Sequence, residues 1–371
     1  MSSFFSTSST SSSSSGSAGS TLAAFGWDEA FDRAFAAHRA AGLVPARIVR
    51  VDRGQCDVAT ESGPVRAGSS AVSSPDPVLS PCTGDWAALR TGSDPQLVAL
   101  LPRRSAIVRS GADRSSRGQA LAANIDTAVV AVSLADPLNP GRIERLLALA
   151  WDSGARPVLA LTKQDLADPS GADAVQAEVT ALAPGVDTVV TSAATGVGLD
   201  VLTAVAYGTT VLLGPSGAGK STLANALLGD EVLATGAVRA QDGKGRHTTV
   251  HRELLLLPGG GVLIDTPGLR GIGLQDAADG LEQVFAEIEQ LAQECAFRDC
   301  GHGTEPDCAV QRAIHTGQLS ERRLDSYRKL LRESAWAASR SDARMRAGRT
   351  DQQKSITRHL RATYRFRERQ Q

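Results

Sequence analysis

The chain has 371 residues and a hydrophobic fraction of 42%, which is enough for two or three domains with apolar cores. Its five cysteines are an odd number, so a fold held together by disulfides is disfavoured. The net charge of −1 is an average over segments of very different charge. No apolar run approaches the ~18–20 residues of a membrane-spanning helix, so no membrane contact is expected.

The first 24 residues form a serine-rich, low-complexity tail, which is predicted to be disordered because it cannot build an apolar core. The tail lacks the apolar centre of a secretion signal and the arginines of an amphipathic organelle peptide. Cytoplasm is therefore the favoured location, with a serine-rich plastid transit peptide as the alternative. Residues 25–44 then show helical apolar spacing that ends at Gly42, which predicts one helix.

Residues 45–110 consist of short alternating runs broken by Gly, Pro, Asp and Ser, which predicts a five-stranded, OB-fold-like barrel. Its cysteines, Cys56 and Cys82, are expected to be core residues. The barrel is also rich in arginine, which suits a nucleic-acid surface, although a structural barrel with a solvated basic rim has the same composition. These arginines are Arg47, Arg50, Arg53, Arg103, Arg104 and Arg109.

Residues 111–274 alternate between wholly apolar runs and amphipathic helical runs. The segments IDTAVVAVSL, PVLALT, DTVVTS and TTVLLG have the composition of strands buried on both faces of a parallel sheet. A further hairpin is predicted in VHRELLLLPGGGVLID. This order predicts one doubly wound α/β domain.

The strongest motif in that domain is GPSGAGKST, which has the G-x-x-x-x-G-K-[ST] pattern of a P-loop between a predicted strand and a predicted helix. Its backbone N–H groups and the helix N-terminus are suited to hold a phosphate chain. Lys220 is expected to contact the β- and γ-phosphates, and Ser221 to ligate Mg²⁺. The predicted GTP-binding residues here are Gly214, Pro215, Ser216, Gly217, Ala218, Gly219, Lys220, Ser221 and Thr222.

Two further segments resemble the switches of a P-loop enzyme. DTPG ends a predicted strand, where Asp265 is expected to position Mg²⁺ and the Gly268 N–H to contact the γ-phosphate. The loop GKGRHTTVH contains Thr248 and Thr249, and one of these hydroxyls, for which Thr249 is the choice, is expected to complete the Mg²⁺ shell.

The base-reading element is predicted in TKQD, Thr162 to Asp165 (with Lys163 and Gln164 between them), at the end of a buried strand. The Asp165 carboxylate can accept hydrogen bonds from guanine N1–H and N2–H₂, a donor pair that adenine lacks. TSAATG follows the next strand, where Ser192 and Ala193 are expected to meet the guanine O6. Because K-x-D alone is weak evidence, a P-loop ATPase with a chance TKQD is the competing interpretation.

The motifs occur in the order base, base, phosphate, switch, switch, whereas ordinary GTPases read the phosphates first. A compact sheet domain whose ends lie close together tolerates being cut and rejoined, so the sequence predicts a circularly permuted GTPase domain. One consequence is that DTPG leads directly into the C-terminal domain, to which nucleotide-driven motion is expected to pass.

Residues 275–371 are predicted to form a helical, zinc-binding domain with a basic tail. The spacing C-x4-C-x-H-x5-C offers three thiolates and one imidazole, a closed structural zinc shell made by Cys295, Cys300, His302 and Cys308. From Arg344 to the end the chain has nine Lys or Arg and two acidic residues. Such a basic tail is suited to bind RNA, although a solvated helical end has the same pattern.

Together these motifs resemble a known family, the circularly permuted GTPases of bacterial small-ribosomal-subunit biogenesis, over nearly the whole chain from Trp27. The resemblance implies an enzyme that hydrolyses GTP when docked on a nearly mature small ribosomal subunit, as a late assembly checkpoint. It further implies that the barrel and the zinc domain hold ribosomal RNA. No motif indicates oligomerisation, so a monomer is the default expectation.

Two positions bear on the mechanism that the resemblance implies. Thr162 replaces the asparagine of most GTPases, and Leu269 replaces the glutamine that orients the attacking water in Ras-like enzymes. Intrinsic hydrolysis should therefore be slow unless another group is supplied. His247 matches the family's switch-loop histidine and is the catalytic candidate beside Lys220 and Thr249, unless it only packs the loop. If hydrolysis is incidental, the alternative is a nucleotide-gated RNA-binding module.

Overall fold

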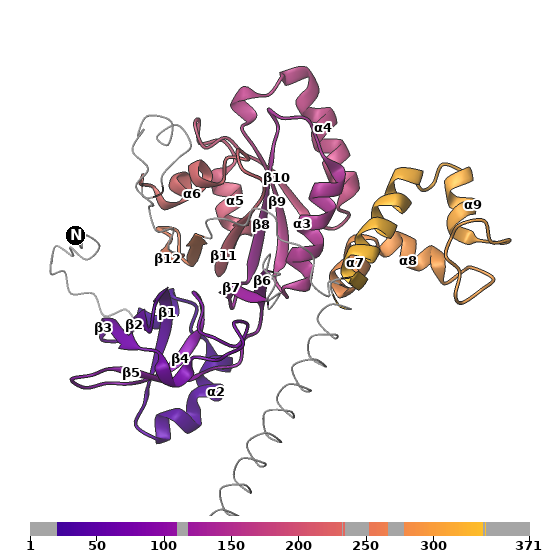
Figure 1. The fold of residues 1–371 in the computed structure, drawn as a ribbon. Helices are drawn as coiled ribbons and strands as arrows, with labels where there is room; N and C mark the ends of the chain where they lie inside the picture. The colour runs from indigo at the N-terminus through magenta and orange to yellow at the C-terminus, as the bar shows by residue number, and fades with distance from the viewer. Residues whose placement is uncertain are drawn as a thin grey trace, which may run out of the picture.

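The computed structural model describes residues 21–109, 118–231, 233, 252–265, 278–336 and 338. It consists of a β-barrel, an α/β domain and a C-terminal helical module (Figure 1). The barrel and the helical module contact different parts of the α/β domain, which lies between them. In the described residues no helix has the length and apolarity needed to span a membrane.

The N-terminal helical segment packs on the barrel. Helix α1 (Thr21–Ala24) is followed by α2 (Glu29–Ala40), which begins where Asp28 accepts hydrogen bonds from the N–H groups of Ala30 and Phe31. The helix buries Phe31 and Phe35, whose rings lie beside Trp27 and, for Phe31, Trp86 of the barrel. Its aromatic face therefore fixes the helix to the barrel.

The barrel closes with five strands. These are β1 (Val44–Asp52), β2 (Gln55–Thr60), β3 (Gly63–Gly68), β4 (Trp86–Arg90) and β5 (Gln96–Leu100), with a short 3-10 turn, η1 (Ser70–Val72), between β3 and β4. The order is β1-β2-β3-β5-β4, and β4 pairs back with β1 to close the sheet. Cys56 lies in its apolar core and Cys82 in a buried loop, and burial raises the pKa of both thiols, to about 11 for Cys56.

The segment after the barrel forms a separate two-stranded sheet. Strand β6 (Ala106–Arg109) pairs with β7 (Gln119–Ala123) and with none of the barrel strands. The predicted barrel range of 45–110 therefore includes one strand that the barrel does not use.

The α/β domain has the strand order β10-β9-β8-β11-β13-β12, in which every pair is parallel except β12 with β13. Its strands are β8 (Thr127–Ser133), β9 (Arg156–Thr162), β10 (Asp187–Val190), β11 (Thr209–Leu213), β12 (Glu253–Leu256) and β13 (Val262–Asp265). Its helices are α3 (Pro140–Asp152), η2 (Gln164–Leu166), α4 (Pro169–Leu182), α5 (Leu199–Val205) and α6 (Lys220–Leu228).

Helices cover both faces of this sheet, as the apolar strands predict. Val130 of β8 and Leu159 of β9 belong to the core that includes residues of α3 and α4, whereas the neighbouring Val129 and Val158 belong to the core of α5 and α6. The observed architecture is the expected doubly wound sheet (Figure 1).

The barrel and the α/β domain share one continuous sheet. Barrel strand β1 pairs with edge strand β12 at Arg50 and Glu253. Arg47, 1% exposed, donates to the Asn124 carbonyl (3.3 Å) and the Thr209 hydroxyl (3.1 Å). Burial lowers the pKa of Arg47 to about 10, which leaves it charged at neutral pH. The barrel is thus bound to the start of β11 as well as to β12.

The C-terminal module contains α7 (Ala278–Val284), α8 (Ala286–Ala292), α9 (Ala309–His315) and a helical segment at 321–336. Helix α7 packs against α3 of the α/β domain, while α9 lies at the far end of the module (Figure 1).

Candidate functional site

The predicted nucleotide-binding residues gather at one edge of the sheet. Strands β10, β9, β8, β11 and β13 are parallel neighbours, so their carboxyl ends face the same way. Thr162 ends β9 and the rest of TKQD follows it, Ser192 and Ala193 follow β10, the P-loop follows β11, and Asp265 ends β13. Ligands of open α/β sheets bind at this edge.

The P-loop has the backbone that its glycines permit. Gly214, Gly217 and Gly219 all have positive φ, at 147°, 86° and 80°. A side chain on Gly214 would also approach the Ala131 carbonyl to 2.8 Å, so only glycine fits there. Helix α6 begins at Lys220, whose Nζ donates to the carbonyls of Gly214 (2.8 Å) and Pro215 (2.7 Å).

The remaining P-loop residues surround this turn. Ala218 is buried beneath it, whereas Ser216 is exposed at its tip. Ser221 and Thr222 lie in the first turn of α6, next to Lys220. The helix therefore presents its N-terminal end at the loop, an arrangement that favours a bound phosphate.

Thr162 links the base-reading strand to the P-loop. Its side chain is nearly fully buried, and its hydroxyl donates to the Ala218 carbonyl at 2.8 Å. The amide that asparagine supplies in most GTPases is absent, but this hydroxyl provides a direct hydrogen bond to the phosphate loop. Sequence reasoning identified the missing amide and missed the bond that threonine makes.

Asp165 is oriented by Ser192. The fully buried Ser192 hydroxyl donates to Asp165 Oδ1 at 2.6 Å and accepts from the Thr195 N–H at 3.2 Å. The two segments predicted to read guanine are therefore joined directly, across 27 residues of sequence. Gln164 and Asp165 are both exposed, so the carboxylate edge is accessible to a base.

Lys163 has the left-handed backbone conformation (φ 60°), and its Nζ lies 3.5 Å from Asp136 Oδ2. Asp136 lies in the loop after β8. Its hydrogen bond with Ser133, together with the nearby Lys163, holds the pKa of this carboxyl below its usual range. Nothing in the sequence pattern indicated Asp136, because it belongs to no motif.

The switch-loop and Mg²⁺ candidates His247, Thr248 and Thr249, with Gly268 and Leu269, lie outside the described residues. Asp265 is described, and it lies at the carboxyl end of β13, beside the P-loop strand β11.

Most of the barrel arginines have partners within the protein. Arg103 makes a two-pronged ion pair with the buried Asp85, with both distances at 2.7 Å. Arg104 binds Asp28, Arg50 binds Asp52, and Arg47 is buried at the domain junction. Arg53 remains exposed. Arg47 and Arg103 therefore belong to the buried contacts of the barrel, whereas Arg50, Arg53 and Arg104 lie at its surface.

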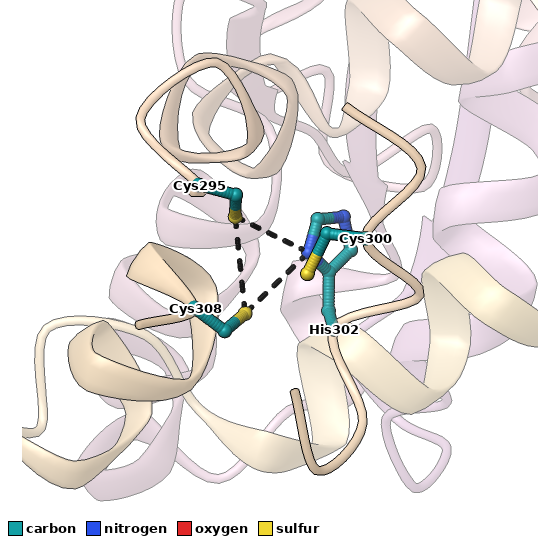
Figure 2. A group of neighbouring side chains, drawn as sticks. All are labelled: Cys295, Cys300, His302 and Cys308. Atoms are coloured by element: carbon teal, nitrogen blue, oxygen red, sulfur yellow. Dashed lines mark hydrogen bonds between the residues drawn. The ribbon is translucent and has the colours of Figure 1, made fainter. Parts of the chain in front are cut away.

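The Cys/His cluster has the dimensions of a tetrahedral metal site (Figure 2). Cys295 Sγ and Cys308 Sγ are 3.8 Å apart, and each lies 3.6 Å from His302 Nδ1. Zinc–sulfur and zinc–nitrogen bonds of ~2.3 and ~2.05 Å at tetrahedral angles give separations of about 3.8 and 3.6 Å. With Cys300 included, all four ligand atoms lie within 4.8 Å of one another, so the four predicted residues can hold one metal ion.

Local hydrogen bonds hold the ligands of the cluster in place. Cys308 caps α9, and its sulfur accepts from the Gln311 N–H at 3.4 Å. Burial opposes ionisation of Cys295, but hydrogen bonds from the backbone of Val310 and Ala309 and from the Cys308 and Cys300 side chains together lower the pKa of this thiol, whereas burial raises the pKa of Cys300 to about 11. His302 has a positive φ of 57°, its Nδ1 lies 3.6 Å from the sulfurs of Cys295 and Cys308, and the Gln311 side chain donates to its carbonyl.

Comparison with known proteins decides the family. A family model described as RsgA GTPase matches residues 100–275. A Streptomyces coelicolor protein named small ribosomal subunit biogenesis GTPase RsgA is 58% identical over 331 residues, which are 88% of this chain and 90% of that protein. This chain belongs to the RsgA GTPase family. A relative of the same name from Opitutus terrae is 40% identical over 93% of this chain and 98% of its own length.

Solved structures agree on the RsgA fold. YjeQ from Thermotoga maritima superposes with a TM-score of 0.58 at 24% identity, over 78% of this chain and 98% of its own. YloQ, described as a circularly permuted GTPase, superposes with a TM-score of 0.57 at 22% identity, over 78% and 94%. The predicted family, the permuted domain order and GTP hydrolysis as the activity are thereby confirmed.

Proposed function

We propose that this RsgA-family GTPase binds the small ribosomal subunit and hydrolyses GTP during its late maturation, as a monomer in the cytoplasm. The observation that carries the proposal is the assembly of two base-reading segments and a P-loop at one sheet edge. It occurs in a chain 58% identical to a protein named for small ribosomal subunit biogenesis.

The site residues take the following proposed roles. Asp165 selects guanine through its carboxylate, and Ser192 and Ala193 lie where backbone N–H groups reach the guanine O6. The P-loop N–H groups and Lys220 bind the phosphates, and in this role Lys220 moves from the loop carbonyls that it contacts now. Ser221, Thr249 and Asp265 would hold Mg²⁺, which would neutralise phosphate charge.

His247 is the proposed group that assists the attacking water, since the leucine at position 269 offers no polar atom for it. Binding to the subunit would place this loop for catalysis, which agrees with slow hydrolysis by the protein alone.

The metal of the C-terminal module is proposed to be one structural Zn²⁺. Three cysteines and a histidine form the donor set that zinc prefers, and four protein ligands leave no open position for a substrate. Contacts with ribosomal RNA are proposed for this module, the basic tail and the barrel surface that includes Arg53.

Nucleotide-dependent sedimentation with ribosomal subunits tests the partner. The protein is expected to co-sediment with purified small subunits in the presence of a non-hydrolysable GTP analogue, and less with GDP. Large subunits serve as the control. Equal binding to both subunits, or binding that ignores the nucleotide, would contradict the proposal.

Thr162→Val tests the link between base site and phosphate loop. Loss of the hydroxyl leaves the buried Ala218 carbonyl without its partner, a cost of about 1–3 kcal/mol. We expect GDP affinity, measured by fluorescence titration, to fall roughly tenfold. Thr162→Ser, which keeps the hydroxyl, is the matched control, and equal affinities of the two variants would remove the proposed role.

A further inference from the structure

A buried carboxylate joins the α/β domain to the C-terminal module. Glu144 of α3 has no solvent exposure. Its Oε1 accepts hydrogen bonds from Arg323 (2.8 Å) and Arg322 (3.1 Å), and its Oε2 accepts from the Ser326 hydroxyl. All three donors belong to the helical segment 321–336, so one α3 side chain gathers three groups of the module.

Arg323 extends the same network into the rest of the module. It is 5% exposed, and its Nε binds Glu287 of α8 at 2.6 Å. Another of its nitrogens donates to the Val284 carbonyl at the end of α7, and its guanidinium lies 4.4 Å from the centre of the Phe285 ring. This arginine therefore connects α3, α7, α8 and the helical segment 321–336.

A second, independent contact fixes α7 on α3. A side chain at Gly280 would approach the Ala148 carbonyl to 2.2 Å, so the two helix backbones are in direct contact there. This close approach fixes the position of α7 along α3, and the Glu144 network fixes the rotation of the module relative to α3.

Because these charged groups are buried, the network is better suited to fix the orientation of the module than to add binding energy. Desolvation cancels much of what a buried ion pair gains, so apolar residues would hold the helices equally well. A buried carboxylate is tolerated only while its donors are in place. A module that turned on α3 would leave the Glu144 carboxyl group without its three hydrogen-bond donors, so the network disfavours other orientations.

We propose that Glu144 and Arg323 are positioning residues that fix the metal-binding module on α3. The module then moves with the half of the α/β domain that contains β8 and β9, and thus with the guanine-reading segment after β9. The sequence alone suggested instead that nucleotide-driven motion passes into the module from DTPG. In this account the attachment to α3 decides the orientation of the module.

A distance measurement on the full chain tests the attachment. Fluorophores are attached through unnatural amino acids at the exposed positions Glu178 on α4 and Arg312 on α9, which leaves the metal-binding cysteines free. The wild-type protein is expected to show one narrow distance distribution, unchanged between GDP and a non-hydrolysable GTP analogue. Glu144→Gln is expected to broaden it. A wild-type distance that shifts with the nucleotide, or a Glu144→Gln distribution as narrow as the wild type, would overturn the proposal.

The control is Arg145→Gln. Arg145 pairs with Glu333 and so joins the same two helical segments, but both side chains are about one-third exposed, and such a pair contributes little. The distribution should stay narrow in this variant. If Glu144→Gln does not fold, as judged by GDP binding and metal content, Arg323→Lys replaces it. Lysine keeps the charge but cannot contact Glu144 and Glu287 together, so the same broadening is expected.

A second readout rests on the proposed function. Subunit-stimulated GTP hydrolysis should fall about tenfold in Glu144→Gln, the size of a typical coupling between sites, while intrinsic hydrolysis and GDP affinity stay unchanged. Stimulation equal to that of the wild type would count against the positioning role. Absence of stimulation in the wild type itself would refute the proposed function, and the distance measurement would still decide on the attachment.

Discussion

Replacing Asp165 with asparagine is expected to lower the affinity for guanine nucleotides by about 100- to 1,000-fold, because the charged acceptor of two hydrogen bonds is lost. The amide oxygen of asparagine can still accept from the guanine N1–H, but its NH₂ group then faces the N2–H₂ group, donor against donor. Xanthine has a carbonyl in place of the 2-amino group, so the same amide can donate to it. Titration with fluorescent GDP and xanthosine diphosphate should show the preference reversed.

Asp173→Asn on the exposed face of α4 makes the same chemical change away from the site, and it is expected to bind GDP as the wild type does. A large loss in the control would indicate a general charge effect. Retention of guanine preference by Asp165→Asn would contradict the base-reading role of Asp165 and assign the selection of guanine to other groups of the site.

Replacing Cys308 with serine is expected to lower metal affinity by at least about 100-fold. Loss of a residue that only hydrogen-bonds to a metal ligand lowers the affinity by about 10- to 100-fold, and loss of a ligand itself costs more. Serine is a good helix N-cap, so it can replace the sulfur that caps α9. Any loss of structure therefore comes from the metal rather than from the cap. Metal content should fall from one per chain toward zero, with faster hydrogen exchange in residues 286–315.

Cys56→Ala is the matched control, because Cys56 lies in the barrel core and should not affect metal content. A Cys308→Ser variant that keeps one tightly bound metal per chain would show that the cluster does not hold it. In Cys308→Ser, the thermal stability of the α/β domain should change little, which melting curves recorded with and without GDP would show.

Local signals explain why the nucleotide site was predictable from the sequence. The P-loop, TKQD and TSAATG each follow an apolar run, and parallel strands bring their carboxyl ends to one edge whatever their order in the chain. The metal cluster was equally predictable from the sequence, because its ligands lie within fourteen residues. The structure adds the Thr162 and Ser192 hydrogen bonds, which no spacing rule indicates.

Contacts between domains were not predictable in the same way. The barrel arginines suggested a nucleic-acid surface, yet Arg47 is buried at the junction and Arg103 is bound to Asp85. Composition cannot distinguish an arginine that faces solvent from one that meets a buried carboxylate far along the chain. The pairing of β1 with β12 and the Glu144 network likewise depend on tertiary packing between segments more than 150 residues apart.

The most direct test of the central claim is phosphate release from GTP and from ATP, with and without purified small ribosomal subunits. We expect slow hydrolysis of GTP by the protein alone, stimulation by small subunits of about 100-fold or more, as partner-activated GTPases show, and no comparable release from ATP. GTP hydrolysis that small subunits leave unchanged would contradict this expectation and favour a nucleotide-gated RNA-binding module whose hydrolysis is incidental.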